Sequence, residues 1–133
     1  MILKALRDCR ERRAVERHAI PDALWELTLL RYPFLAQRSA ADQAELRRLC
    51  SLFLADKEFH GAGGFEVTDE VAVAVAAQAC LPVLRLGLAW YDGFVGIVMH
   101  EGRSWRRAAS RTRTASCTSM TRNSPVKRWR VAR

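Results

Sequence analysis

The distribution of charge and of leucine changes abruptly near residue 100, and this change limits how much of the chain can fold. Residues 1–99 hold 12 Lys/Arg against 13 Asp/Glu, whereas residues 100–133 hold 10 Lys/Arg and one acidic residue, Glu101. All 15 leucines lie before residue 100. A highly charged segment with few large apolar side chains cannot bury enough surface to offset its loss of conformational entropy. The sequence therefore predicts a folded region followed by a disordered basic tail.

Hydrophobic spacing predicts that most of the folded region is helical. Apolar residues recur at helical intervals in 2–18, 22–32 and 40–58. Pro21 suits a first helical turn, and Ser39 is a good N-cap with an acidic residue three positions later. Thr68 and Asp69 can cap a further helix that begins near residue 70. The stripe on 2–18 is weak, so we expect a solvated helix that a few leucines dock onto the rest.

A small-residue segment and a β-rich segment complete the fold class. Residues 70–80, EVAVAVAAQAC, could alternate as a strand, but alanine and the length favour a helix buried on all sides. Residues 94–99 are β-branched and aromatic and follow Asp92-Gly93, so they predict a strand. Residues 65–67 form a second candidate strand. The fold class is α+β, with a sheet whose other strands lie largely outside this chain.

The three histidines, His18, His60 and His100, are the first candidates for metal chemistry. None lies within four residues of another. A zinc peptidase of the HExxH type needs two imidazoles one helical turn apart and a glutamate that activates the metal-bound water. His100-Glu101 begins like that motif, but the second histidine is missing. We therefore expect a loop role for His60 and a strand end at His100, and we assign no catalytic, cofactor-binding or metal-binding residue.

Glycines and cysteines exclude two further kinds of site. The glycine-rich stretch 60–64 lacks the preceding strand and the following lysine of a phosphate-binding loop. The cysteines form no CxxC pair, so we expect small core or surface thiols at Cys9, Cys50, Cys80 and Cys117. Without an export signal or an apolar run of 18 residues, the expected location is the reducing cytoplasm, with no membrane association.

The region 59–100 resembles a known family. The markers are Gly64-Phe65-Glu66, Thr68-Asp69, the helix that ends in QACLPVL, and Leu88-Ala89-Trp90-Tyr91 before the strand. Upstream, Ile20-Pro21 and the helix that carries Phe53-Leu54 and Lys57 also fit. These features, in this order over residues 20–100, are similar to the Mlc titration factor A family of bacterial glucose-regulated zinc metallopeptidases.

The resemblance implies a fold, a cofactor and a partner. It implies the helix-rich N-terminal portion of a zincin-like metallopeptidase with aminopeptidase-like activity. Members of this family are about twice as long, and their HExxH helix and further glutamate ligand lie in the later half, so no zinc ligand carries over to this chain. The domains expected are an N-terminal helix at 1–19, the family-like region at 20–100 and the basic tail at 101–133. The family also implies contact with a Mlc-like transcriptional repressor.

The tail departs from the continuation that the resemblance implies, which is a proline and an acidic segment. Residues 111–133 read RTRTASCTSMTRNSPVKRWRVAR. Moving the reading frame back by one base, with permitted synonymous codons, gives an acidic sequence without a stop. We therefore hypothesise that the tail is a frameshift product, which the nucleotide sequence decides.

Two other functions remain open at this point. The chain could be a non-catalytic module that contacts a transcriptional repressor. It could also bind nucleic acid through residues 103–133, because nine arginines, Lys127, Trp105 and Trp129 could neutralise phosphates and stack on bases. A frameshifted tail of this charge would bind polyanions non-specifically. The leading prediction is a truncated metallopeptidase that is inactive alone.

Overall fold

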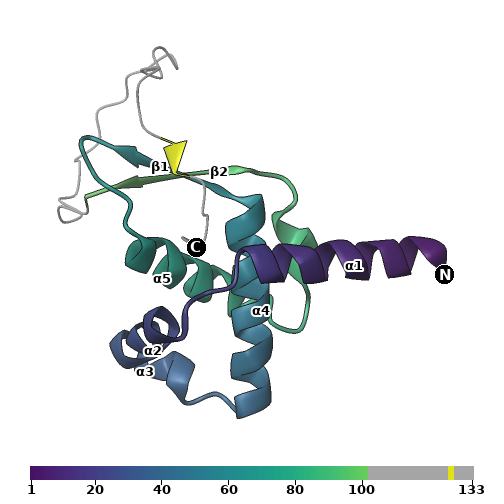
Figure 1. The fold of residues 1–133 in the computed structure, drawn as a ribbon. Coiled ribbons are helices and arrows are strands. Elements are labelled where there is room, and N and C mark those ends of the chain that lie inside the picture. Colours follow the sequence, from purple (N-terminus) through teal and green to yellow (C-terminus); the bar gives the residue numbers. More distant parts are fainter. Residues whose placement is uncertain (102–125, 128–133) are drawn as a thin grey trace, which may run out of the picture.

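The computed structural model describes residues 1–101 and 126–127, and it confirms the α+β class (Figure 1). The elements in chain order are α1 (Ile2–Arg17), α2 (Asp22–Arg31), α3 (Pro33–Ala36), α4 (Ala40–Asp56), β1 (Glu58–Ala62), α5 (Asp69–Cys80), the 3₁₀ helix η1 (Leu88–Tyr91), β2 (Gly96–His100) and β3 (Val126–Lys127). Helical spacing correctly predicted α1, α2 and α4, and alanine content with segment length correctly predicted α5, each within about two residues at either end.

The core forms where α4 crosses α5. Both helices begin with the expected caps, because the Ser39 hydroxyl accepts the Asp42 N–H at 3.2 Å and the Thr68 hydroxyl accepts the Val71 N–H at 3.4 Å. The α4 stripe is fully buried against the small residues of α5. The largest buried side chains are Phe53, Phe59, Ile20, Leu35, Leu46, Leu54 and Val73.

Helix α5 is less enclosed than we expected. Its buried residues are Ala72, Val73, Ala74, Ala76, Ala77 and Cys80. Gln78 is exposed, and Val71, Val75 and Ala79 are only half-buried. The expectation of burial on all sides was therefore wrong, because the described helices cover α5 on one side and leave a stripe toward the surface.

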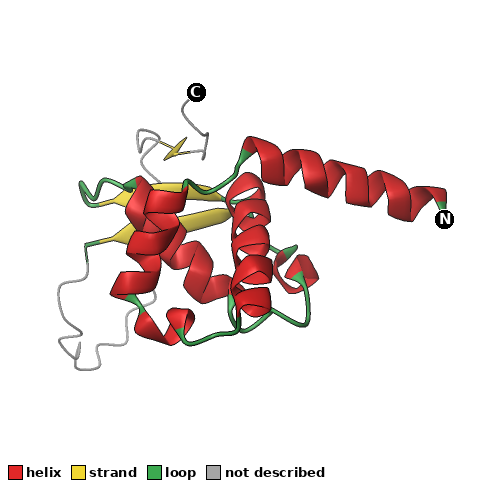
Figure 2. Ribbon diagram, turned by 60° about the horizontal axis from the view of Figure 1, so that its bottom comes forward, coloured by secondary structure: helices red, strands yellow, loops and turns green. Residues whose placement is uncertain are grey.

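The sheet has the order β2-β1-β3, with β1 parallel to β2 and antiparallel to β3. The strand predicted at 94–99 is confirmed with a shift of two residues, since β2 runs from Gly96 to His100. Helices α2 to α5 lie on one side of this sheet (Figures 1 and 2).

Strand β1 corrects two sequence-based predictions. The stretch 60–64 was expected to be a loop, but His60–Ala62 belongs to β1, and only Gly63 and Gly64 form the turn, with φ of 64° and 82°. Residues 65–67 were expected to be a strand and are not one. Pairing with β2, which follows almost forty residues later, decides where the strand lies, and local propensity could not reveal that partner.

Helix α1 projects from the rest of the molecule (Figure 2) and has no buried residue. The leucines predicted to dock it do not do so, because Leu3 is 83% exposed and Leu6 57% exposed. The half-buried positions are instead Glu11, Ala14, Val15 and His18. The side of α1 that faces α4 therefore combines small apolar residues with Glu11 and does not include Leu3 or Leu6, which hydrophobic spacing could not predict.

No helix in residues 1–101 is long and apolar enough to cross a membrane. The predicted basic tail lies outside the described residues except at β3, where Val126 and Lys127 depart from the expected disorder by pairing with β1. The nucleic-acid arm at 103–133 and the domain boundaries stay predictions.

Candidate functional site

The three histidines do not gather at one place in the structure. Two of them, His60 and His100, lie on neighbouring strands of the sheet. His18 follows α1, and its Nδ1 is buried without a hydrogen-bond partner. His60 and His100 lie on adjacent strands, where His60 is opposite Val98 and His100 is opposite Ala62. His100 ends β2 as predicted, whereas His60 was expected in a loop.

The His60 side chain lies on the sheet face that points away from the helices. Its Nε2 is 3.9 Å from Glu58 Oε2, and a Cβ placed on Gly96 would meet that nitrogen at 3.7 Å. Within residues 1–101 and 126–127, no group of three or more His, Cys, Asp or Glu side chains could hold a metal ion. The described part of the chain therefore does not supply the ligand set of a catalytic zinc site.

A buried lysine organises the segment between η1 and β2. Lys57 is 2% exposed, and its ammonium donates to Asp56 Oδ2 and to the carbonyls of Tyr91 and Phe94, each at 2.6 Å. Three donors thus meet three acceptors, and Nζ also lies 4.6 Å from the centre of the Phe94 ring. The Tyr91 hydroxyl donates to the Ala79 carbonyl at 2.9 Å. These bonds fix the entry to β2.

The family-like features of the sequence included Lys57 without giving its role. Nothing in the spacing showed that its side chain would reach carbonyls more than thirty residues later. Because every proton of the ammonium has an acceptor, the charge is held in place rather than presented to a substrate. We therefore interpret Lys57 as a structural residue of the fold.

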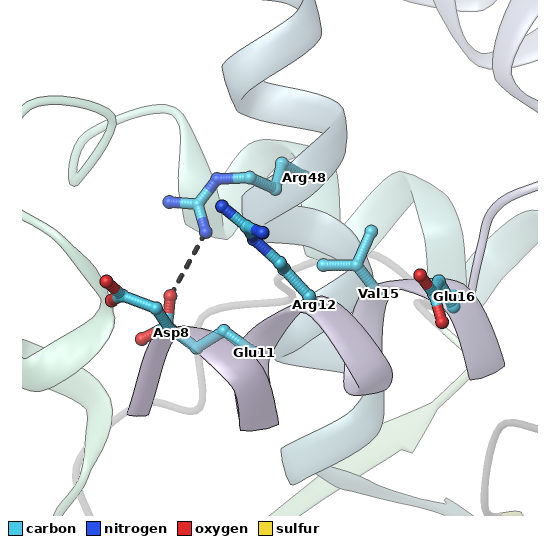
Figure 3. Close-up of a pocket in the computed structure, with 6 residues that line it drawn as sticks. All are labelled: Asp8, Glu11, Arg12, Val15, Glu16 and Arg48. Atoms are coloured by element: carbon cyan, nitrogen blue, oxygen red, sulfur yellow. Dashed lines mark hydrogen bonds and ion pairs between the residues drawn. The ribbon is translucent and has the colours of Figure 1, made fainter. Parts of the chain in front are cut away.

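Two surface hollows lie beside α1. The larger, of about 660 Å³, lies between α1, α4 and residues 86–92, and its lining includes Leu49, Leu52, Leu88, Arg7 and Arg10. The smaller, of about 430 Å³, is lined by Asp8, Glu11, Arg12, Val15, Glu16 and Arg48 (Figure 3). The described residues that line them include no histidine, serine or cysteine.

An ion-pair network crosses the smaller hollow from α4 to α1. Arg48 makes a two-point contact with Glu45, at 2.8 and 2.9 Å, and reaches Glu11 on α1 at 3.2 Å. The hydrogen bond from Arg48 holds the pKa of Glu45 below its ordinary value of 4.5, against a smaller opposing effect of burial. The same bond raises the pKa of Arg48. Periodicity did not identify this network, because its members come from two helices far apart in sequence.

The lowered pKa of Glu45 predicts how the network responds to pH. A carboxyl whose pKa is depressed in the folded state stabilises that state above its unfolded pKa, and the contribution disappears as pH falls through the folded pKa. Replacement Arg48→Gln should lower the free energy of unfolding by about 0.5–1 kcal/mol near pH 7, since the groups are partly exposed. Urea titrations should show that this loss shrinks below pH 4.5.

The matched control is Arg13→Gln, because Arg13 is exposed on α1. It should change stability by less than about 0.5 kcal/mol at either pH. A loss for Arg48→Gln that is the same at pH 7 and at pH 3 would contradict the assignment of Glu45 as its partner.

Two buried thiols join α4 to α5. Cys50 and Cys80 are both 0% exposed, and burial, together with the hydrogen bond that the Cys50 thiol donates to Cys80, raises the pKa of the Cys50 thiol well above its ordinary value. The predicted core and surface roles are confirmed for Cys50, Cys80 and the exposed Cys9. Cys117 lies outside the described residues. Because the thiolate is the reactive form, Cys50 is chemically inert in the folded chain.

Thiol accessibility gives a direct check of this packing. Iodoacetamide should modify Cys9 in native buffer and leave Cys50 and Cys80 unmodified, whereas all three should react in 8 M urea. Peptide mass spectrometry locates the label. Rapid native labelling of Cys50 would show that α4 and α5 do not pack as described.

Comparison with known proteins gives one family and several bacterial relatives. The family model described as glucose-regulated metallo-peptidase M90 matches residues 6–125, which extends beyond the range 20–100 on both sides. The chain is 39% identical over 82 residues to Mlc titration factor A of Enterobacter sp. (strain 638), covering 60% of this chain and 31% of that protein.

Two further relatives show the same partial coverage. Identity is 41% over 126 residues to the uncharacterized protein slr2042 of Synechocystis sp., covering 76% of this chain and 45% of the relative. The chain is 40% identical over 76 residues to Mlc titration factor A of Cronobacter sakazakii, and the match covers 57% of this chain and 28% of that protein. The chain thus spans less than half the length of these relatives.

Proposed function

We propose that this chain, which belongs to the glucose-regulated metallo-peptidase M90 family, is the N-terminal region of a zinc-dependent, aminopeptidase-like enzyme and is inactive alone. The observation that carries the proposal is the match of residues 6–125 to the family model. The resemblance of residues 20–100 to Mlc titration factor A supports the assignment to the N-terminal region.

The proposed lack of peptidase activity rests on the zinc ligands that this chain does and does not contain. Its 133 residues contain no HExxH pair, and His100-Glu101 lacks the second imidazole. Among the described residues, no group of three or more His, Cys, Asp or Glu side chains could hold a metal ion. Peptide hydrolysis by a metal-activated water requires about three protein ligands, so we assign the zinc ligands of the parent enzyme to sequence beyond this chain.

We also propose that the basic tail, 101–133, results from a frameshift. Its arginine content and its compatibility with an acidic sequence in the neighbouring frame support this interpretation. The parent enzyme would then continue with the acidic, zinc-binding part in that frame, and it would act in the cytoplasm. Sequencing the locus decides this point, because a neighbouring frame without an HExxH-bearing continuation would contradict it.

A cleavage assay tests the activity of the chain. The purified chain and the intact Enterobacter relative are incubated with chromogenic aminopeptidase substrates, with added Zn²⁺ and then with a chelator. We expect the relative to release chromophore in a chelator-sensitive manner and the chain to remain at the background rate. Chelator-sensitive release by the chain alone would overturn the proposal.

A second candidate function is a non-catalytic contact with a transcriptional repressor. It is favoured by the names of the two relatives called Mlc titration factor A, which describe factors that titrate Mlc. The large surface hollow between α1 and residues 86–92 is the place in the described structure where such a contact could form. Co-purification of the tagged chain with a Mlc-type repressor would support this function, and no co-purification while the intact relative binds would exclude it.

A further inference from the structure

Strand β2 lies at an edge of the sheet, and most of its surface is open. In the described part of the chain, β2 has β1 as its one neighbouring strand, since β3 pairs with the other side of β1. Of residues 94–100, Ile97 and Met99 pack against the core. The other five are exposed, and we call them the β2 surface: Phe94, Val95, Gly96, Val98 and His100.

The two faces of the parallel pair β1–β2 are covered unequally. Helices lie along the inner face of the sheet (Figures 1 and 2). On that face Phe59 is 1% exposed and lies opposite Ile97. On the outer face, Val98 is 61% exposed and lies opposite His60. Parallel sheets are normally covered on both faces, because the crossover elements that connect their strands lie there. Among residues 1–101 and 126–127, therefore, nothing covers Val98 on the outer face in the way a parallel pair is usually covered.

The β2 edge also lacks the residues that normally protect a free edge. Exposed edge strands are usually blunted by lysine, proline or inward-pointing charges, which prevent pairing with another chain. Residues 94–100 read FVGIVMH and contain no proline and no Lys, Arg, Asp or Glu. An exposed edge of this composition is typical of a strand that pairs with further polypeptide.

The length of the relatives indicates what that polypeptide is. The matched regions make up 31% of the Enterobacter relative and 28% of the Cronobacter relative. More than half of each relative is thus available to cover surfaces of the region that resembles this chain. The alternative occupant, a second copy of this chain, has no comparable observation in its favour.

We propose that the β2 surface binds the remaining part of an M90 polypeptide, which adds a strand beside β2 and covers Val98. This inference rests on the proposed function, because it assumes that the chain corresponds to one region of the enzyme. The chain and the remainder would then assemble even when they are separate molecules.

Co-expression tests the assembly. The tagged full-length chain is produced together with the part of the Enterobacter relative that it does not match, and purified by its tag. We expect the two to co-elute in a 1:1 ratio. Val98→Asp, which buries a charge only in the assembly, should reduce the recovered remainder at least about tenfold. The control Leu3→Asp, on the projecting helix α1, should leave recovery unchanged.

Three outcomes would overturn the proposal. The chain could elute without the remainder, Leu3→Asp could reduce recovery as much as Val98→Asp, or the chain alone could form a dimer that Val98→Asp dissociates. The failure of the proposed function is recognised separately. If the complex forms but shows no chelator-sensitive cleavage while the intact relative does, the docking surface stands and the enzymatic role of this region fails.

Discussion

Replacement Leu54→Ala should reduce the free energy of unfolding by about 3–5 kcal/mol. Leu54 lies on α4, is 0% exposed and belongs to the cluster that also contains Phe53 and Val73. Removing its branched end deletes apolar contacts and leaves a cavity, because the surrounding helices can relax only in part. The loss is a large fraction of the total stability of a small domain, which is about 5–15 kcal/mol.

The control for this prediction is the same chemical change at an exposed site. Leu3 lies on α1 and is 83% exposed, so Leu3→Ala should alter stability by less than about 0.5 kcal/mol. Urea denaturation followed by circular dichroism measures both variants. Equal losses would mean that the α4 stripe does not form the core.

Replacement Lys57→Met should lower the free energy of unfolding by about 2–5 kcal/mol, although methionine has a similar volume. The change removes the ammonium that pairs with Asp56 and leaves the carbonyls of Tyr91 and Phe94 without their donor. Because these carbonyls precede β2, the backbone amides of that strand should also lose protection against hydrogen exchange. Hydrogen exchange should become faster in residues 91–100, in addition to the shift of the urea midpoint.

Lys4→Met on the exposed surface of α1 is the matched control and should be neutral within about 0.5 kcal/mol. The double variant Lys57→Met with Asp56→Asn should be no less stable than Lys57→Met alone, since the aspartate has already lost its partner. A neutral Lys57→Met would contradict the described role of this lysine.

Residues whose partners lie nearby in sequence were predicted well. The caps at Ser39 and Thr68 and the helices that follow them depend on contacts within a few residues, so local patterns suffice. The strand β1 was missed, because its hydrogen bonds go to β2, and the segment between them contains a whole helix. Local propensity at Gly61 favoured a loop, and long-range pairing placed this residue in β1 instead.

In the candidate site, too, local features were predicted from the sequence and long-range contacts were not. Spacing alone showed that the histidines do not form an HExxH pair. It could not show that His60 would face Glu58 on an open sheet, or that Arg48 would bridge to Glu11 on α1. The exposure of Leu3 and Leu6 was also unpredictable, because an apolar stripe indicates which face of a helix can be buried and not whether a partner for it is present.

The proposed function requires that this member of the M90 family does not hold a catalytic zinc ion with its own residues. The most direct measurement is the zinc content of the purified 133-residue chain, by plasma mass spectrometry, after incubation with excess Zn²⁺ and exhaustive dialysis. The intact Enterobacter relative serves as the positive control. We predict far less than one zinc per chain, against about one per molecule of the relative. One tightly held zinc per chain would contradict the account.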